Sequence, residues 1–172
     1  WSPKKDRAIL KYLQDDNLRI FSAFFNGSST QGIFLSPQIS AIATSPDEDK
    51  IFYIIPAGET NVGVVASFED KNKRQIISLP FGDFVASWPA KDLLSLTTRA
   101  SASAEGFVYV LDVKNGSFKR ALYGVKGMSV VWSPRTKKAI ISGHANMGAI
   151  ETAILDLDQK ALSLISARTL AE

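Results

Sequence analysis

The sequence contains no cysteine and a single histidine, His144. Without cysteine, this chain has no disulfide, no thiolate metal site and no cysteine nucleophile. With one histidine, it cannot build a catalytic zinc site on paired histidines. We therefore expect neither a metal site nor a cofactor.

Long apolar runs and nucleophile motifs are also missing. The longest apolar runs, such as "IFYIIPAG" and "FVYVL", have the length of a strand and not of a membrane-spanning helix. No Gly-x-Ser-x-Gly elbow and no Gly-rich phosphate loop occurs. His144 lies near Ser142 and Asn146, but a lone loop histidine is more typical of a solvated residue than of a catalyst. We predict that the chain is not an enzyme, although paired glycosidase carboxylates brought together from different repeats would leave no sequence motif.

The composition is that of an ordinary globular protein. Hydrophobic residues make up 45% and charged residues 22% of the 172 residues, and the net charge is +3. This length suffices for one domain with a sizeable core and is short for two. We expect a single domain over residues 1–172.

A proline turn recurs along the whole chain. The phrases "WSPKKDRAIL", "TSPDEDKIFYII", "SWPAKDLLSL" and "WSPRTKKAII" place prolines at Pro3, Pro46, Pro89 and Pro134, with spacings of 43, 43 and 45 residues. The repeats cover residues 1–43, 44–86, 87–131 and 132–172. A period of this length with β-type patterning favours a propeller blade or a similar β-array.

Each repeat shows the same order of segments. An apolar run precedes the proline turn, and a second apolar run, a polar loop, a third strand, a tight turn and a fourth strand follow. Asn26-Gly27 and Asn115-Gly116 are strong hairpin signals. Asp112 and Asp156, each at the end of a third strand, are expected to bind the amides of the next turn. The sequence thus predicts an all-β protein, a β-propeller with about four repeats, each a four-stranded antiparallel blade.

These motifs resemble a known repeat family. The "WSP" turn, the strand after it and the hairpin "VYVLDVKNGSFKRAL" are similar to the Tol-type periplasmic propeller repeat, a WD-repeat-like unit with the pattern Trp-Ser-Pro-Asp-Gly. The propellers of prolyl peptidases carry related blades. This chain has drifted, because its turns read "PKKD", "PDED", "PAKD" and "PRTK". The resemblance implies a propeller and a periplasmic or extracellular bacterial location.

The residues of the repeated turn are interpreted as structural. They are Trp1, Pro3, Pro46, Trp88, Pro89, Trp132 and Pro134. We expect Trp1 and Trp132 to pack between neighbouring blades, as large apolar residues do where sheets stack.

The first repeat lacks its innermost strand, so three ways of completing the ring stay open. The chain is part of a larger propeller, or two copies form one ring, or residues 166–172 ("SARTLAE") supply the strand that pairs before Trp1. An uncovered blade edge and face would favour aggregation, which makes a partner or closure the better physical expectation.

The loops are expected to emerge on two faces. Most basic residues fall on the face of the proline turns, where solvated lysines are common, so an anionic partner is a weaker interpretation. The aromatics lie mainly within strands, which argues against nucleic-acid binding. The opposite face carries the candidate binding residues, which are Asp15, Asp16, Glu59, Asn61, Arg99, His144 and Asn146. A cation held by Asp15, Asp16 and Glu59 is disfavoured, because no dense Asp-x-Asp-x-Asp-Gly loop is present.

Two functions remain. The first is a non-catalytic scaffold that recognises a protein or polymer, with a second copy of the chain as one further partner. The second is an accessory propeller of a larger enzyme, prolyl-peptidase-like or glycosidase-like, whose catalytic part lies elsewhere.

Overall fold

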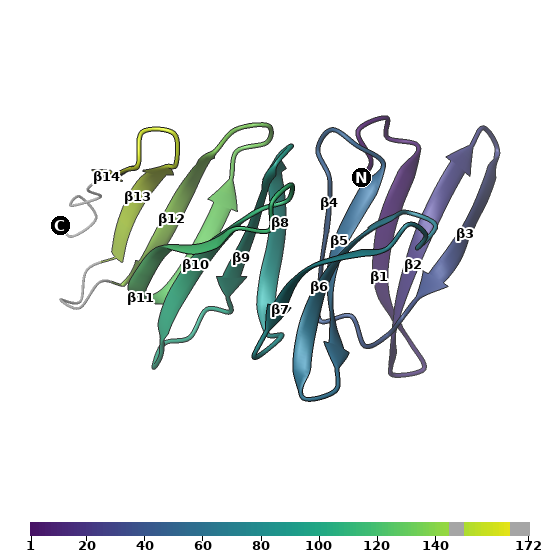
Figure 1. Ribbon diagram of the computed structural model, residues 1–172, viewed down its shortest axis with the longest axis horizontal. Coiled ribbons are helices and arrows are strands. Elements are labelled where there is room, and N and C mark those ends of the chain that lie inside the picture. Colours follow the sequence, from purple (N-terminus) through teal and green to yellow (C-terminus); the bar gives the residue numbers. More distant parts are fainter. Residues whose placement is uncertain (145–149, 166–172) are drawn as a thin grey trace, which may run out of the picture.

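The computed structural model describes residues 1–144 and 150–165, in which every helix or strand element is a β-strand (Figure 1). Fourteen strands form three antiparallel sheets within these residues. This part of the chain contains no helix long and apolar enough to cross a membrane. The all-β prediction is confirmed.

The first sheet has three strands, in the order β1 (Arg7–Gln14), β2 (Asn17–Asn26) and β3 (Ser29–Leu35), and is called unit 1. Its two turns contain two residues each. Asp15 and Asp16 both have positive φ, of 50° and 59°, and Gly27 has φ of 59°. Short polar residues and glycine tolerate this region, so the polar loop and the Asn-Gly signal fold as the sequence predicts.

The second sheet, unit 2, has the full four strands: β4 (Ala41–Thr44), β5 (Lys50–Ala57), β6 (Thr60–Ser67) and β7 (Arg74–Leu79). Tyr53 on β5 donates a hydrogen bond of 2.8 Å to Asp70 in the β6–β7 turn. Burial, together with this bond to a carboxylate, raises the pKa of the Tyr53 hydroxyl. The bond ties the turn to the middle of the sheet.

The third sheet has seven strands. They are β8 (Phe84–Ala90), β9 (Leu93–Thr98), β10 (Glu105–Asp112), β11 (Phe118–Trp132), β12 (Lys138–His144), β13 (Ile150–Asp156) and β14 (Ala161–Ile165). The first half of β11 pairs with β10 and its second half with β12. Unit 3 consists of β8, β9, β10 and the first half of β11. Unit 4 consists of the second half of β11 with β12, β13 and β14.

The continuity of β11 differs from the sequence prediction, which placed two separate strands there. The chain passes from unit 3 to unit 4 without a loop because it bends at Gly124 and Gly127, whose φ angles are 84° and 60°. Register shifts on both sides of this bend let one strand serve two sheets. The four sequence repeats therefore occupy three sheets.

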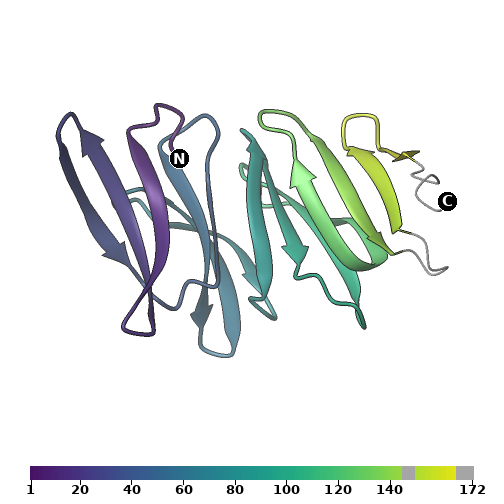
Figure 2. The ribbon, with the colours of Figure 1, turned by 180° about the vertical axis from the view of Figure 1, so that it is seen from behind.

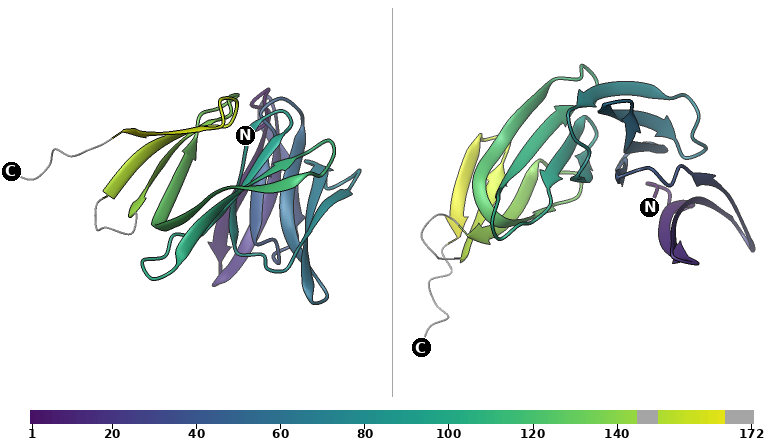
Figure 3. Two further views of the ribbon diagram at one scale, coloured as in Figure 1. Left: turned by 60° about the vertical axis from the view of Figure 1, so that its left-hand side comes forward. Right: turned by 90° about the horizontal axis from the view of Figure 1, so that it is seen from below.

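The units stack face to face along an arc, which Figure 3 shows from below and Figure 2 shows from behind. Strand β5 shows how this packing works. Ile51 and Tyr53 pack with unit 1, whereas Phe52 and Ile54, on the opposite face, pack with unit 3. A third cluster, which includes Met128 and Ile141, joins units 3 and 4. Both faces of a middle strand are buried, so its sequence is a continuous apolar run.

Polar contacts also link the units. Arg7 Nη1 lies 2.7 Å from Glu69 Oε1 of unit 2. Arg74 Nη2 donates to the carbonyl oxygen of Val113 in unit 3 at 2.7 Å. The amide of Arg135 donates to the carbonyl oxygen of Pro89 at 2.7 Å, which joins the turns of units 3 and 4. Each junction thus combines an apolar core with at least one polar bond near its edge.

The packing predicts a large difference between two leucines. Leu94→Ala should lower the free energy of unfolding by about 2–5 kcal/mol, because Leu94 is fully buried between units 2 and 3. Leu13→Ala is the matched control, since that side chain is 73% exposed and should cost less than about 1 kcal/mol. Urea unfolding measures both, and equal losses would contradict the face-to-face packing.

Candidate functional site

The repeated proline turns have a common hydrogen-bond geometry. The amides of Ser2, Ser45 and Ser133 donate to the carbonyl oxygens of Arg7, Lys50 and Lys138, at 2.8, 2.9 and 2.9 Å. Each bond closes the connection between the first and second strand positions of its repeat. The three serines therefore begin the same turn in units 1, 2 and 4.

The third repeat differs at this turn, as its "SWP" order suggests. Ala90 pairs with Leu93, so the β8–β9 connection is tighter than in the other repeats. Trp88 is buried and its Nε1 donates to the carbonyl oxygen of Lys91 at 3.3 Å. Trp88 thus seals the unit 2–unit 3 core near the turn.

A cavity of about 760 Å³ runs along the first strand of each unit. We call this cavity, together with its mouth, the axial pocket. The residues that line the cavity are Trp1, Ile9 and Lys11 of unit 1, 42–46 of unit 2, 86–89 of unit 3, and 130–132 and Pro134 of unit 4. In units 2, 3 and 4 the strand before the proline turn faces the cavity, whereas unit 1 contributes β1, the strand after its proline turn. All four units thus line one site, but not through equivalent positions.

The mouth of the axial pocket lies among the proline turns and has a volume of about 560 Å³. Its lining residues are Trp1, Ser2, Pro3, Lys5, Ser45, Pro46, Pro134 and Arg135. This lining consists of four apolar residues with rings, two serines and two cationic residues, and it contains no carboxylate. Such a mouth suits an apolar ligand group next to a negative charge.

The sequence expectation for Trp1 is wrong. Trp1 is 67% exposed and stacks on Phe25 of its own unit, with ring centroids 5.6 Å apart. Among the described residues β1 is an edge strand of its sheet, and Trp1 lies just before it. Trp132 is half-buried against the unit 3–unit 4 core, and its buried Nε1 has no hydrogen-bond partner among the described residues.

The acidic turn beside the mouth is held by its own hydrogen bonds. Ser2 Oγ donates to Asp6 Oδ1 at 2.7 Å and accepts from the amide of Arg7 at 3.1 Å. The hydrogen bond from Ser2 lowers the pKa of the Asp6 carboxyl. This carboxylate is therefore occupied within its own turn.

Some of the other charges at the proline-turn end are paired. Ion pairs join Lys50 to Glu48, Lys73 to Asp70, Lys114 to Asp92, Lys137 to Asp158 and Lys138 to Asp156. Exposed pairs of this kind add little stability, but they neutralise much of the positive charge expected on this face. Lys5 and Arg135 form no ion pair with any described residue.

Asp112 and Asp156 bind the turns that follow them, as predicted. Asp112 Oδ1 accepts from the amides of Lys114 and Asn115 at 2.8 and 3.1 Å. Asp156 Oδ1 accepts from the amides of Asp158 and Gln159 at 3.0 and 3.2 Å. Both carboxylates are therefore structural.

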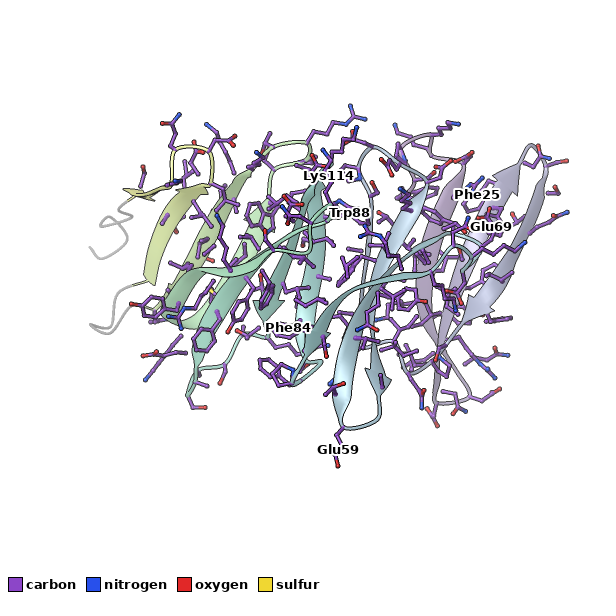
Figure 4. The ribbon with its side chains drawn as sticks, viewed as in Figure 1. Phe25, Glu59, Glu69, Phe84, Trp88 and Lys114 are labelled. Carbon is purple, nitrogen blue, oxygen red and sulfur yellow. The ribbon has the colours of Figure 1, made fainter. Side chains whose placement is uncertain are left out.

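The loop residues proposed from sequence lie at the opposite end of the units. Figure 4 places Glu59 at one end of the molecule and Lys114 and Trp88 toward the other. Asp15 and Asp16 form the β1–β2 turn, and no hydrogen bond or ion pair joins them to Glu59. In the part of the chain that the structure describes, no three His, Asp or Glu side chains gather as metal ligands.

The remaining loop candidates are also separate. Arg99 Nε lies 2.5 Å from Asp83 Oδ1, which makes a local ion pair. The Asn61 side chain fills the space beside Gly82, where an added Cβ would lie 2.6 Å from Asn61 Oδ1. His144 is exposed and lines a cavity of about 520 Å³ with Ser101 and Lys126. Asn146 lies outside the described residues, and ligand binding at this end stays a prediction.

The axial pocket was not identified from sequence, although its residues were. The repeat period marked the tryptophans and prolines, but they were interpreted as structural. The repeated turn residues could have predicted the pocket, because repeats that stack along an arc bring their corresponding ends close to a common axis. Only the curvature of the arc decides how closely they approach one another.

The comparisons with known proteins identify the fold of the chain. No family model and no curated protein matches the sequence. Among solved structures, TolB from Acinetobacter baumannii matches with a TM-score of 0.68 and 14% identity over 100% of this chain and 43% of its own. The β-propeller domain of the Trilobed protease from Pyrococcus furiosus matches with a TM-score of 0.61 and 13% identity, over 92% of this chain and 52% of its own.

A chain of the nidogen–laminin complex also matches, with a TM-score of 0.58 and 12% identity over 89% of this chain and 58% of its own. The chain thus spans about half the length of these structures. Identities this low establish the fold alone. The fold is that of a β-propeller, as the sequence predicted.

The turn at the mouth makes a prediction about acid titration. In Ser2→Ala the pKa of Asp6 should rise toward its ordinary value, because the hydrogen bond that lowers it is lost. A lowered carboxyl pKa stabilises the fold above the unfolded-state pKa, and this contribution is lost as the pH falls through the folded-state pKa. The variant should therefore lose less stability on acidification than the wild type.

NMR titration of the carboxyl carbons measures this change. Asp156 serves as the internal control, because its pKa is lowered chiefly by its hydrogen bond with Lys138. The pKa of Asp156 should be the same in Ser2→Ala as in the wild type. An unchanged Asp6 pKa in Ser2→Ala would show that Ser2 is not the cause.

Proposed function

We propose that the chain is a non-catalytic propeller scaffold of the Tol-type repeat family, whose axial pocket binds an extended segment of a partner protein or polymer. The observation that carries this proposal is the pocket itself, to which all four units contribute and which ends in a mouth rich in apolar rings. Binding sites in proteins are commonly concave and mostly apolar, with a few polar groups that set orientation.

Two features of the pocket support recognition by a partner. Trp1 lines it and is 67% exposed, so a large apolar surface is open to solvent. Exposed aromatic side chains beside a cation are typical of the residues that dominate binding energy. The turns that hold them are tied down by backbone hydrogen bonds, so little ordering is needed on binding.

Catalysis has less support in the described residues. His144 forms no side-chain hydrogen bond with any described serine or carboxylate, and Ser142 lies two residues before it on β12. At the loop end, Asp83 is ion-paired with Arg99, and no three His, Asp or Glu side chains gather among the described residues. The Tol-type resemblance adds a periplasmic or extracellular location to the proposal.

The alternative is an accessory propeller in a larger enzyme. Its support is that one similar structure is the propeller domain of a protease, and that acylaminoacyl peptidase from Pyrococcus horikoshii is also similar, with a TM-score of 0.64. In that case a catalytic domain would lie on the same polypeptide. Purified hydrolytic activity that is lost in His144→Ala would overturn the non-catalytic proposal.

A random peptide library tests the scaffold function. Peptides selected on the wild-type chain should bind Trp1→Ala at least tenfold more weakly, since the indole is the largest open apolar surface of the mouth. Tyr123→Ala is the control, because that ring is 61% exposed on β11 and lies outside the pocket. Titration calorimetry measures the affinities. Selected peptides that bind both variants equally would contradict the axial site.

The two end faces of the arc support a further partner, a second copy of the chain. On the open face of unit 1, Leu10, Phe21 and Phe34 lie opposite one another across the three strands. On the open face of unit 4, Val131, Ile140 and Ile154 lie opposite one another on neighbouring strands. These are the positions by which inner units bury their faces, and apolar sheet faces this open are typical of interaction sites.

A second copy would pair the unit 1 face of one chain with the unit 4 face of the other and complete a ring. Light scattering should then give the mass of two chains, and Phe34→Glu should give the mass of one, since it places a charge on the joined face. Ser28→Glu, in the exposed β2–β3 turn, is the matched control and should leave the mass at two chains. If light scattering gave the mass of a single chain for the wild-type protein, this assembly would be contradicted.

A further inference from the structure

Two cationic residues at the mouth of the axial pocket have a backbone conformation that favours glycine. Lys5 has φ of 61° and Arg135 has φ of 59°. A residue with a Cβ is destabilised in this left-handed region, whereas glycine enters it freely. Both turns therefore carry a charged side chain at a position that glycine would occupy with less strain.

The turns hold both residues firmly in place. The amide of Lys5 donates to the carbonyl oxygen of Ser2 at 3.0 Å. The amide of Arg135 donates to the carbonyl oxygen of Pro89, which anchors this turn on the neighbouring unit. Strained residues that the surrounding structure keeps in position are found mainly at functional sites.

Their side chains share one small and largely apolar space. Both line the mouth of about 560 Å³ together with Trp1, Pro46 and Pro134, and neither has an ion pair with a described residue. The acid next to Lys5 in sequence is Asp6, and its Oδ1 accepts from Ser2. No carboxylate lines the mouth, so its positive charge is not balanced from within the lining.

We propose that the mouth binds the free C-terminal carboxylate of a peptide that ends in an apolar residue. This inference rests on the proposed function and names its ligand class. Arg135 donates to the carboxylate through its guanidinium fork, and Lys5 adds a second positive charge. Trp1 and the two prolines pack against the last side chain of the peptide. A terminal carboxylate fits because it places a charge directly beside an apolar group.

The test compares two forms of one peptide, acetyl-Gly-Gly-Phe with a free carboxylate and the same peptide with a C-terminal amide. The free acid should bind the wild-type chain about tenfold or more tightly than the amide, as expected for a charge-assisted hydrogen bond. Added salt should weaken the binding of the acid and change that of the amide little. Titration calorimetry measures both.

The variants Lys5→Gly and Arg135→Gly separate this role from a structural one. Each should raise the midpoint of urea unfolding, because glycine removes the left-handed strain, and each should weaken binding of the free acid about tenfold. Lys4→Gly is the matched control: Lys4 is exposed, does not line the mouth and is not left-handed. It should keep the affinity and gain no stability.

Three outcomes would overturn the inference. They are equal affinity for the acid and the amide, no binding of the acid, and glycine variants that are more stable but bind as tightly as the wild type. The failure of the axial site itself is recognised separately, because library peptides would then bind Trp1→Ala as well as they bind the wild type. If Trp1→Ala loses binding while acid and amide bind equally, the scaffold function stands and the carboxylate site does not.

Discussion

The burial of both faces of the middle strands is the constraint on which the rest of this structure depends. In β5, Phe52 and Ile54 pack toward unit 3 while Ile51 and Tyr53 pack toward unit 1, so one strand joins two cores. A single sheet of this kind cannot bury its own apolar surface, and each unit is therefore stable only against its neighbours. The stack is curved (Figure 3), and the axial pocket lies along β1, β4, β8 and the second half of β11.

The same constraint explains the two ends of the arc and the mouth of the pocket. Unit 1 and unit 4 each have one covered face and one open face, and the open faces carry Phe34 and Ile140. Trp1 lies next to β1, an edge strand of unit 1, and is also exposed. The open surfaces that suggest partners thus follow from how the units stack and not from unusual local sequences.

The sequence predicted the strands closely and the site poorly. Period-two patterning and turn chemistry are local, so the hairpins at Gly27 and Gly116 and the aspartates that bind the following turns could be foreseen. The continuity of β11 could not, because Gly124 and Gly127 resemble ordinary loop glycines until both halves of the strand find their partners. The loop candidates were chosen for polarity, and polarity does not say which residues of different units converge.

By itself, the sequence determined the repeat, the all-β class and the propeller fold, because turn chemistry and a period near 43 residues set the order of the strands within a repeat. Only the tertiary structure decided the roles of particular residues. It exposes Trp1, buries Trp88, separates Asp15 from Glu59, and brings Lys5 of unit 1 and Arg135 of unit 4 to one mouth. These outcomes depend on the angle and distance between stacked sheets, which arise from many packing contacts and are written in no single motif.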